Sequence, residues 1–159
     1  MKSVLISIQR PHTDNIKALI KKIEIRKNKP NQETPFPCFI YETKTKGGCG
    51  KVIGEFVCDE VYEWKYDYCD GVDIDDDLIL DTCLDREDIN IYAKGKTLYG
   101  WHISDLKIYD KTKPIMQFYK PCPIEWKNCP VCEFYSTYTG CCMNNIDRPP
   151  QSWCYVEEL

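Results

Sequence analysis

The sequence is poor in histidine, with only His12 and His102 in 159 residues. The sequence therefore offers few histidines that could act as the base for a catalytic nucleophile. The sequence contains no Gly-x-Ser-x-Gly nucleophile elbow, and it has no glycine-rich loop of the kind that cradles phosphates. These absences argue against a triad hydrolase and against a P-loop enzyme.

Long apolar runs and an excess of positive charge are also missing. No apolar run approaches the roughly 20 residues that span a bilayer, so we expect no membrane partner. The net charge is −4, which argues against broad binding to duplex nucleic acid but leaves room for a local basic cleft. Residues 4–8 form a short apolar run without a signal-peptide pattern. We therefore expect a cytoplasmic protein.

The chain does contain enough apolar material for a folded core. Hydrophobic residues make up 43% of the sequence and aromatic residues 13%, a composition that excludes global disorder. We expect residues 1–159 to form a single domain, because this length is typical of one.

Two helices are expected from local patterns. The first follows Thr13, a suitable N-cap, and continues over apolar residues spaced along one helical face: Ile16, Leu19, Ile20, Ile23. The second covers residues 84–93, with Asp85 as its cap and Gly95 just past its end. Counted from Asp73, the sixth and twelfth positions of an EF-hand calcium loop fall on Leu78 and Leu84 instead of glycine and glutamate, so we expect the acidic stretch 67–77 to be a solvated loop.

Alternating and β-branched segments predict six or seven strands, which with the helices indicates an α+β fold. Glycines between the expected strands 39–43 and 51–58 favour a hairpin connection. Tyr99, Trp101 and Ile103 are expected to share one face of their strand, with His102 and Ser104 on the other. The expected strands are residues 4–9, 24–27, 39–43, 51–58, 99–103, 106–109 and 151–156.

Residues 21–27 predict a helix end that passes directly into a strand. Ile23 and Ile25 alternate with Glu24 and Arg26, the pattern of a strand with one apolar and one charged face. A charged face of both signs, entered from a helix end at Lys21, is suited to form the wall of a cleft.

Five short phrases occur in a particular order along the chain. They are Leu5–Ile8, Lys21–Lys27, Gly54–Phe56, Tyr99–Ile103 leading to Leu106, and Pro150–Trp153. In this order they resemble the ASCH domain family of the PUA-like superfamily, over about residues 3–110 and 149–158. The later phrases look most like those of bacterial and phage members.

The resemblance implies a small PUA-like β-barrel of about six strands with two flanking helices and a cleft. It also implies binding of single-stranded RNA or a modified nucleoside or nucleotide. One branch of the family hydrolyses N4-acylated cytidines with a lysine, a threonine and a glutamate. Lys21 matches that lysine, whereas Glu24 stands where the threonine is found.

Three functions are therefore open: RNA or modified-nucleotide binding, an amidohydrolase with Lys21 and Glu24 as catalytic residues, and an accessory module that binds another protein. Whether the protein is an enzyme stays undecided at this point. Trp101, Trp153 and Tyr155 can stack on a base, although a place in the core is favoured for them. The candidate ligand-binding residues are Lys21, Glu24, Arg26, His102, Ser104 and Ser152.

The 11 cysteines are unevenly spaced, and their odd number disfavours a disulfide framework. Five of the cysteines lie within residues 120–148, and two of these form a Cys-x-x-Cys step. Such thiolates can bind zinc, so we expect a cysteine-rich insertion there with a structural zinc ion. Free thiols in a flexible insertion are the alternative. The expected zinc ligands are Cys122, Cys129, Cys132 and Cys141, with Cys142 as the alternative to Cys141. Buried thiols are expected at Cys38, Cys58, Cys69, Cys83 and Cys154.

Overall fold

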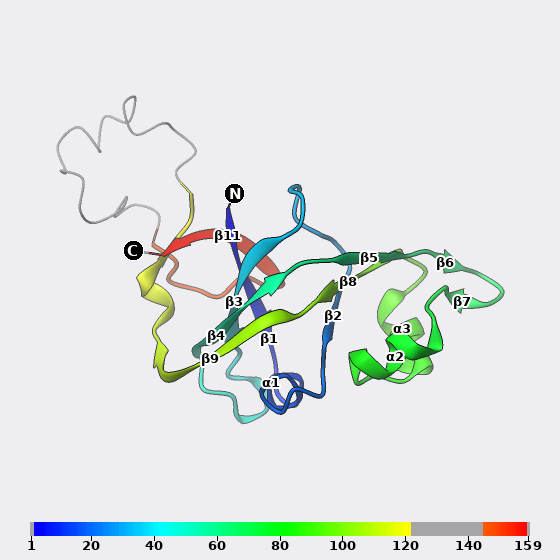
Figure 1. The fold of residues 1–159 in the computed structure, drawn as a ribbon, viewed down its shortest axis with the longest axis horizontal. Coiled ribbons are helices and arrows are strands. Elements are labelled where there is room, and N and C mark those ends of the chain that lie inside the picture. Colours follow the sequence, from blue (N-terminus) through cyan, green and yellow to red (C-terminus); the bar gives the residue numbers. More distant parts are fainter. Residues whose placement is uncertain (1, 122–144, 159) are drawn as a thin grey trace.

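The largest sheet is curled and has six strands arranged around the N-terminal strand β1 (Figure 1). The structure is a computed structural model that describes residues 2–121 and 145–158. Strand β1 pairs parallel with β3 on one side and antiparallel with β11 on the other. In sheet order the strands are β10 (Phe118–Tyr119), β11 (Trp153–Glu158), β1 (Ser3–Ile8), β3 (Phe36–Glu42), β4 (Lys51–Cys58) and β9 (Ser104–Lys113).

A second sheet of three strands carries the segment that the sequence marks as a cleft wall. Strand β2 (Ile23–Arg26) pairs antiparallel with β8 (Leu98–His102), which also pairs with β5 (Val61–Trp64). The remaining elements are β6 (Tyr66–Asp67), β7 (Gly71–Val72), α1 (His12–Lys17), α2 (Asp76–Thr82), α3 (Arg86–Ala93) and the short helical turns Thr45–Gly47 and Ile115–Gln117. The predicted α+β class is therefore confirmed, and the expected barrel of about six strands is present as a curled, half-barrel sheet of six strands.

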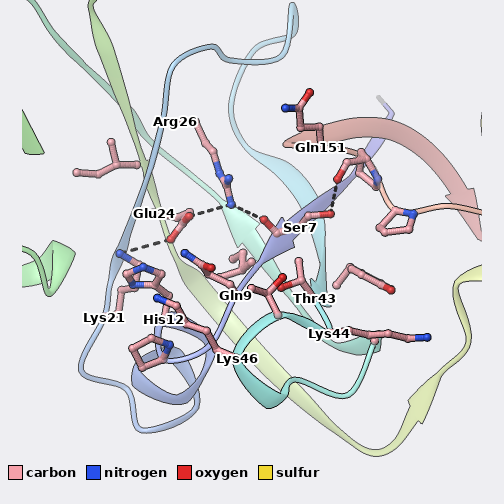
Figure 2. A pocket seen from close by; sticks show the side chains of 18 of the residues that line it. Ser7, Gln9, His12, Lys21, Glu24, Arg26, Thr43, Lys44, Lys46 and Gln151 are labelled. Atoms are coloured by element: carbon pink, nitrogen blue, oxygen red, sulfur yellow. Dashed lines mark hydrogen bonds and ion pairs between the residues drawn. The ribbon is translucent and has the colours of Figure 1, made fainter. Parts of the chain in front are cut away.

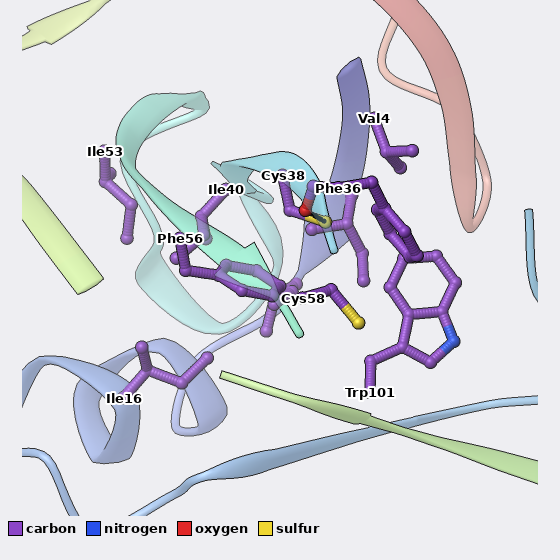
Figure 3. Close-up of a cluster of buried hydrophobic side chains, with 11 residues drawn as sticks. Val4, Ile16, Phe36, Cys38, Ile40, Ile53, Phe56, Cys58 and Trp101 are labelled. Atoms are coloured by element: carbon purple, nitrogen blue, oxygen red, sulfur yellow. Dashed lines mark hydrogen bonds between the residues drawn. The ribbon is translucent and has the colours of Figure 1, made fainter. Parts of the chain in front are cut away.

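The main core lies between the large sheet, α1 and β8 (Figure 3). Val4, Ile6 and Ile8 point into this core, while Leu5 points into a second apolar cluster on the other face of the sheet. Because β1 is buried on both faces, its sequence is apolar at nearly every position instead of alternating. Trp101 is completely buried and meets Phe36 edge to face, with ring centroids 5.7 Å apart, so its predicted core position is confirmed.

Helix α1 is shorter than its apolar spacing predicts. It ends at Lys17, and the carbonyl of Asn15 accepts hydrogen bonds from the N–H groups of both Ile20 and Lys21. Leu19 adopts a left-handed backbone conformation with φ 60°, so the chain turns away before a further helical turn can form. Leu19 and Ile20 are consequently exposed, and the predicted apolar stripe is wrong at those two positions.

The acidic segment contains more regular structure than expected. Residues 66–67 and 71–72 pair as two short strands, and helix α2 begins at Asp76, so the expected loop is wrong, whereas the aspartates of the stretch are exposed to solvent as expected. The described residues hold three α-helices where two were expected. The cap of α3 is confirmed, because the carboxylate of Asp85 accepts a hydrogen bond from the Asp88 N–H at 2.7 Å.

The cysteines outside the cysteine-rich segment differ in burial, and Cys83 and Cys154, expected to be buried, are only partly so. Cys38 and Cys58 are fully buried as expected, and burial raises the pKa of the Cys58 thiol to about 12. Cys69 is exposed, because it lies in the turn between β6 and β7, so the expected burial is wrong there. None of the helices that the structure describes is long and apolar enough to cross a membrane.

A buried carboxylate joins α1 to the end of β3. Glu42 accepts hydrogen bonds from the Thr13 hydroxyl at 2.7 Å, the Lys17 ammonium at 2.9 Å and the Cys49 N–H at 2.8 Å. Burial acts to raise the pKa of Glu42, but these donors outweigh it and lower the pKa to about 2. The interaction holds helix α1 and the turn after β3 against the large sheet.

We expect Glu42→Gln to lower the free energy of unfolding by about 2 kcal/mol at pH 7, because it removes charge-assisted hydrogen bonds. The pKa of Glu42 is depressed in the folded state, so its contribution is present above the ordinary pKa near 4.5 and is lost as the pH falls toward 2. Urea unfolding at pH 7 and pH 3 should show the two proteins converging at the lower pH. Glu63→Gln, at a half-exposed position, is the control, and an equal gap at both pH values would contradict the prediction.

Candidate functional site

A cleft of about 1160 Å³ opens at the carboxyl ends of the parallel strands β1 and β3 (Figure 2). The segments that follow these two strands meet there, and the Thr43 N–H donates to the Ile8 carbonyl at 2.9 Å. The loop ends of adjacent parallel strands are a common place for ligand sites, because both strands direct their following loops to the same edge. The lining residues come mainly from segments 7–12, 21–26, 41–50, 83–92 and 147–151.

A chain of buried charges forms one wall of the cleft. Glu24 lies between two cations, with its Oε2 3.4 Å from Lys21 Nζ and its Oε1 2.9 Å from Arg26 Nη2. Lys21 also donates to the Thr82 carbonyl at 2.5 Å, and Arg26 donates to the Ser7 carbonyl at 2.8 Å. Lys21 and Glu24 are 2% and 6% exposed, so this is a buried network that ties three parts of the chain together.

The short strand β2 brings the three charged residues together. Ile23 and Ile25 are buried on its apolar side, and Glu24 is buried on the cleft side. The alternation in the sequence therefore distinguishes an apolar face of β2 from a charged face. The charged face borders the cleft and is not open to bulk water.

The charges around Glu24 keep it ionised. Burial acts to raise the pKa of Glu24, but the positive charges of Lys21 and then Arg26 outweigh it, so the pKa lies below its ordinary value. Because both carboxylate oxygens already have cationic partners, Glu24 orients Lys21 and Arg26 rather than offering a free base to a ligand.

Three residues that line the cleft carry buried polar atoms without a hydrogen-bond partner among the described residues: His12 Nδ1, Arg26 Nε and Thr43 Oγ1. Buried polar groups are nearly always paired with protein, water or ligand. The fourth such atom in the described part of the chain, Trp101 Nε1, belongs to the core and not to the lining. The unpaired polar groups therefore concentrate at the cleft.

His12 enters the cleft beside the charged wall. Burial lowers the pKa of His12, and Glu24 acts in the opposite direction, while Lys21 and Lys46 add to the lowering. The imidazole is consequently neutral at neutral pH, with one ring nitrogen as a donor and the other as an acceptor.

The structure places the predicted site residues in two groups. Lys21, Glu24 and Arg26 meet in the cleft, whereas His102 and Ser104 do not line it. His102 Nδ1 lies 2.7 Å from a carboxylate oxygen of Asp59, and the Ser104 hydroxyl donates to a backbone carbonyl at 2.8 Å.

Ser152 lies next to the cleft lining and not in it. Its carbonyl accepts a hydrogen bond from the Ser7 N–H at 2.9 Å. The neighbouring residues Pro150 and Gln151 do line the cleft, and the Ser7 hydroxyl donates to the Pro150 carbonyl at 2.7 Å. Ser152 therefore contributes to holding the C-terminal segment beside β1.

The lining residues missed by the reasoning from sequence include His12, Thr43, Lys44 and Lys46. A usable signal was present for the last three, because Thr43 ends a predicted strand and the two lysines follow it in a glycine-containing turn. His12 gave less signal, since it precedes a predicted helix as an isolated polar residue.

The expected zinc ligands Cys122, Cys129, Cys132 and Cys141 lie outside the described residues, as does most of the expected insertion 120–148. Within residues 2–121 and 145–158 no group of three or more histidine, cysteine or acidic side chains is placed to hold a metal ion.

The curled sheet and its cleft define a small α+β fold, and solved structures identify the type of fold. The ASCH protein of Zymomonas mobilis is similar with a TM-score of 0.63 and 16% identity, over 98% of this chain and 88% of that chain. A tyrosine-to-phenylalanine variant of the same protein gives a TM-score of 0.62 at 14% identity, over 99% of this chain and 91% of that chain. The chain thus has the fold of an ASCH domain, as its sequence phrases predicted.

No protein-family model matches the sequence, and no curated protein matches it significantly. At this level of identity the structural likeness shows the fold alone.

We predict that Lys46→Gln raises the pKa of His12, because the Lys46 charge is among those that hold it down. Titration of the histidine ring resonances by NMR measures the shift directly, and the protein has only one other histidine. Lys65→Gln, at an exposed position outside the cleft lining, is the charge-matched control. Unchanged titration of His12 in Lys46→Gln would show that the two side chains do not face each other.

Proposed function

We propose that the cleft binds a segment of single-stranded RNA or a modified nucleotide. The observation that carries this proposal is the concentration of unpaired, buried polar atoms on His12, Arg26 and Thr43. A nucleobase presents donors and acceptors along its edges, and such groups are suitable partners for an imidazole, a guanidinium and a hydroxyl.

The charge of the cleft supports the same proposal. The protein as a whole is acidic, with a net charge of −4. The described cleft lining nevertheless carries four lysine and arginine side chains against three carboxylates. A locally basic cleft in an acidic protein suits a single nucleotide or a short single strand, because a duplex would meet the acidic surface around it.

An aromatic side chain is available at the cleft edge. Tyr92 lines the cleft and is 38% exposed, and Lys27 Nζ lies 4.8 Å from its ring centroid. Single-stranded nucleic acids are commonly held by stacking of bases on aromatic rings. Tyr92 is therefore the candidate stacking residue, in place of Trp101, which is in the core.

We expect Arg26→Lys to weaken binding of single-stranded RNA oligomers and nucleosides at least tenfold. Lysine retains the charge beside Glu24 but has neither the Nε donor nor the forked geometry of the guanidinium. Fluorescence anisotropy and calorimetry measure the affinities, and Arg86→Lys is the matched control because Arg86 does not line the cleft. Absence of binding by the wild-type protein to every oligomer and nucleoside tested would end the proposal.

A second candidate function is hydrolysis of the amide of an N4-acylated cytidine. It is favoured by one observation: the unpartnered hydroxyl of Thr43 lines the same cleft as Lys21 and Glu24. A lysine, a hydroxyl and a carboxylate are thereby present together, although the threonine comes from a different segment than the sequence resemblance implies.

For this second function, we expect wild-type protein to release cytidine and acetate from N4-acetylcytidine, and Thr43→Val to abolish the release. Chromatography of the products at high protein concentration measures turnover. Thr45→Val, in the same turn, is the control. Lack of turnover in the wild type would leave the binding proposal standing and remove the hydrolase.

A further inference from the structure

We infer that single-stranded RNA leaves the cleft over an outer track, which is formed by residues 27–32 together with Lys2. The inference rests on the proposed function and adds that the ligand is an RNA strand of several nucleotides rather than a lone nucleotide. Lys27, Lys29 and Lys2 are the residues that contact its backbone phosphates.

The outer track begins at the edge of the cleft. Residues 27–32 directly follow Arg26, the last residue of β2, and continue toward β3 (Figure 1). Arg26 lines the cleft, and so does Tyr92, whose ring centroid lies 4.8 Å from Lys27 Nζ. An RNA strand with one nucleotide in the cleft therefore meets residues 27–32 as it leaves.

Strand β11 fixes the middle of this segment. Trp153 Nε1 donates to Asn28 Oδ1 at 2.7 Å, and the Asn31 N–H donates to the Tyr155 hydroxyl at 2.8 Å. These two hydrogen bonds restrict the backbone between them, which includes Lys29. Most of the segment is exposed, but because it is attached, binding an RNA strand costs less ordering entropy than it would on a free loop.

Gln32 holds Lys2 next to the segment. The Gln32 amide accepts a hydrogen bond from the Lys2 N–H at 3.2 Å and donates one to the Lys2 carbonyl at 2.9 Å. Lys2 Nζ lies 5.5 Å from the ring centroid of Tyr155, the same residue whose hydroxyl holds Asn31. A lysine from the start of the chain is thereby added to the outer track.

The lysines of the outer track lie against tyrosine rings. Lys29 Nζ is 5.5 Å from the ring centroid of Tyr99, as Lys27 and Lys2 are close to the rings already named. A cation–π contact orients an ammonium group, yet it leaves the N–H donors available to phosphate oxygens.

Acidic neighbours neutralise this charge only weakly. Lys29 lies 4.0 Å from Glu63, and both side chains are 48% exposed, so their pairing is weak. Lys2 and Lys27 have no ion pair within residues 2–121 and 145–158. The ammonium groups are therefore available to the phosphates of a single strand.

A second hollow lies along the outer track. It has a volume of about 450 Å³, and its lining includes Lys29, Gln32, Thr34 and Val61, with Glu33 as its acidic residue. Apolar surface combined with an amide and a hydroxyl suits an unstacked base, because the base offers a flat face and polar edges. The hollow thus provides a place for a further nucleotide whose phosphate reaches Lys29.

The first experiment compares ligands of different length by calorimetry. For the nucleoside 5′-monophosphate that binds most tightly, the homopentanucleotide of the same base is expected to bind at least tenfold more tightly to the wild-type protein. Lys2→Gln/Lys29→Gln should lower the pentanucleotide affinity at least fivefold and leave the monophosphate affinity unchanged. Lys65→Gln/Lys96→Gln, with the same change of charge at exposed positions outside the track, should change neither.

The second experiment measures the dependence of pentanucleotide affinity on salt. In a single strand each phosphate contact contributes about 0.7 to the slope of log affinity against log salt concentration. Lys2→Gln/Lys29→Gln is therefore expected to reduce the magnitude of the slope by about 1.4. An equal reduction in Lys65→Gln/Lys96→Gln would show a general effect of charge and overturn the inference.

The outcomes distinguish the outer track from the proposed function. Equal affinity of the wild type for the monophosphate and the pentanucleotide, or a pentanucleotide affinity that Lys2→Gln/Lys29→Gln retains, overturns the track and leaves nucleotide binding in the cleft intact. Pentanucleotide binding that this double variant loses and Arg26→Lys leaves unchanged supports the track and removes the cleft as the RNA site.

Discussion

The buried carboxylate of Glu24 is the interaction on which the rest of the site depends. It holds Lys21 and Arg26, and through them it connects the end of α2 at Thr82 with strand β1 at Ser7. Burying three charges costs desolvation free energy, and such networks often contribute little net stability. Losing one member leaves an uncompensated buried charge, so the network specifies one geometry of the cleft wall more than it stabilises the fold.

The parallel pairing of β1 and β3 decides where the cleft forms. Residues 4–8 lie in register with residues 38–42, so the segments that follow the two strands leave the sheet at the same edge. One segment brings Gln9 and His12, and the other brings Thr43 to Lys46. The buried Glu42 ties them together, because it accepts hydrogen bonds from α1 and from the turn after β3. The cleft therefore has a charged wall from β2 and a rim from two loops that are remote in sequence.

Much of the fold was predictable where the signal was local. The continuous apolar run of β1, the glycine-containing β3–β4 hairpin and the capping of α3 by Asp85 each follow from neighbouring residues. The end of α1 was not predictable in this way. Its apolar spacing continues to Ile23, but the Asn15 carbonyl captures the Ile20 and Lys21 N–H groups and turns the chain. Apolar spacing therefore indicated that a helix forms without indicating where it stops.

By itself, the sequence determined that Glu24 and Arg26 share the charged face of a strand that Lys21 closely precedes, because the alternation along one short segment is set by local geometry alone. Only the tertiary structure decided which other side chains meet them. His102 has the alternation expected of a polar strand face, yet its strand lies between β2 and β5, and His102 pairs with Asp59 away from the cleft. His12 and Lys46 carry no joint pattern in the sequence, because 33 positions separate them. The parallel pairing of β1 and β3 brings their segments to the same cleft, and this long-range arrangement has no local signal.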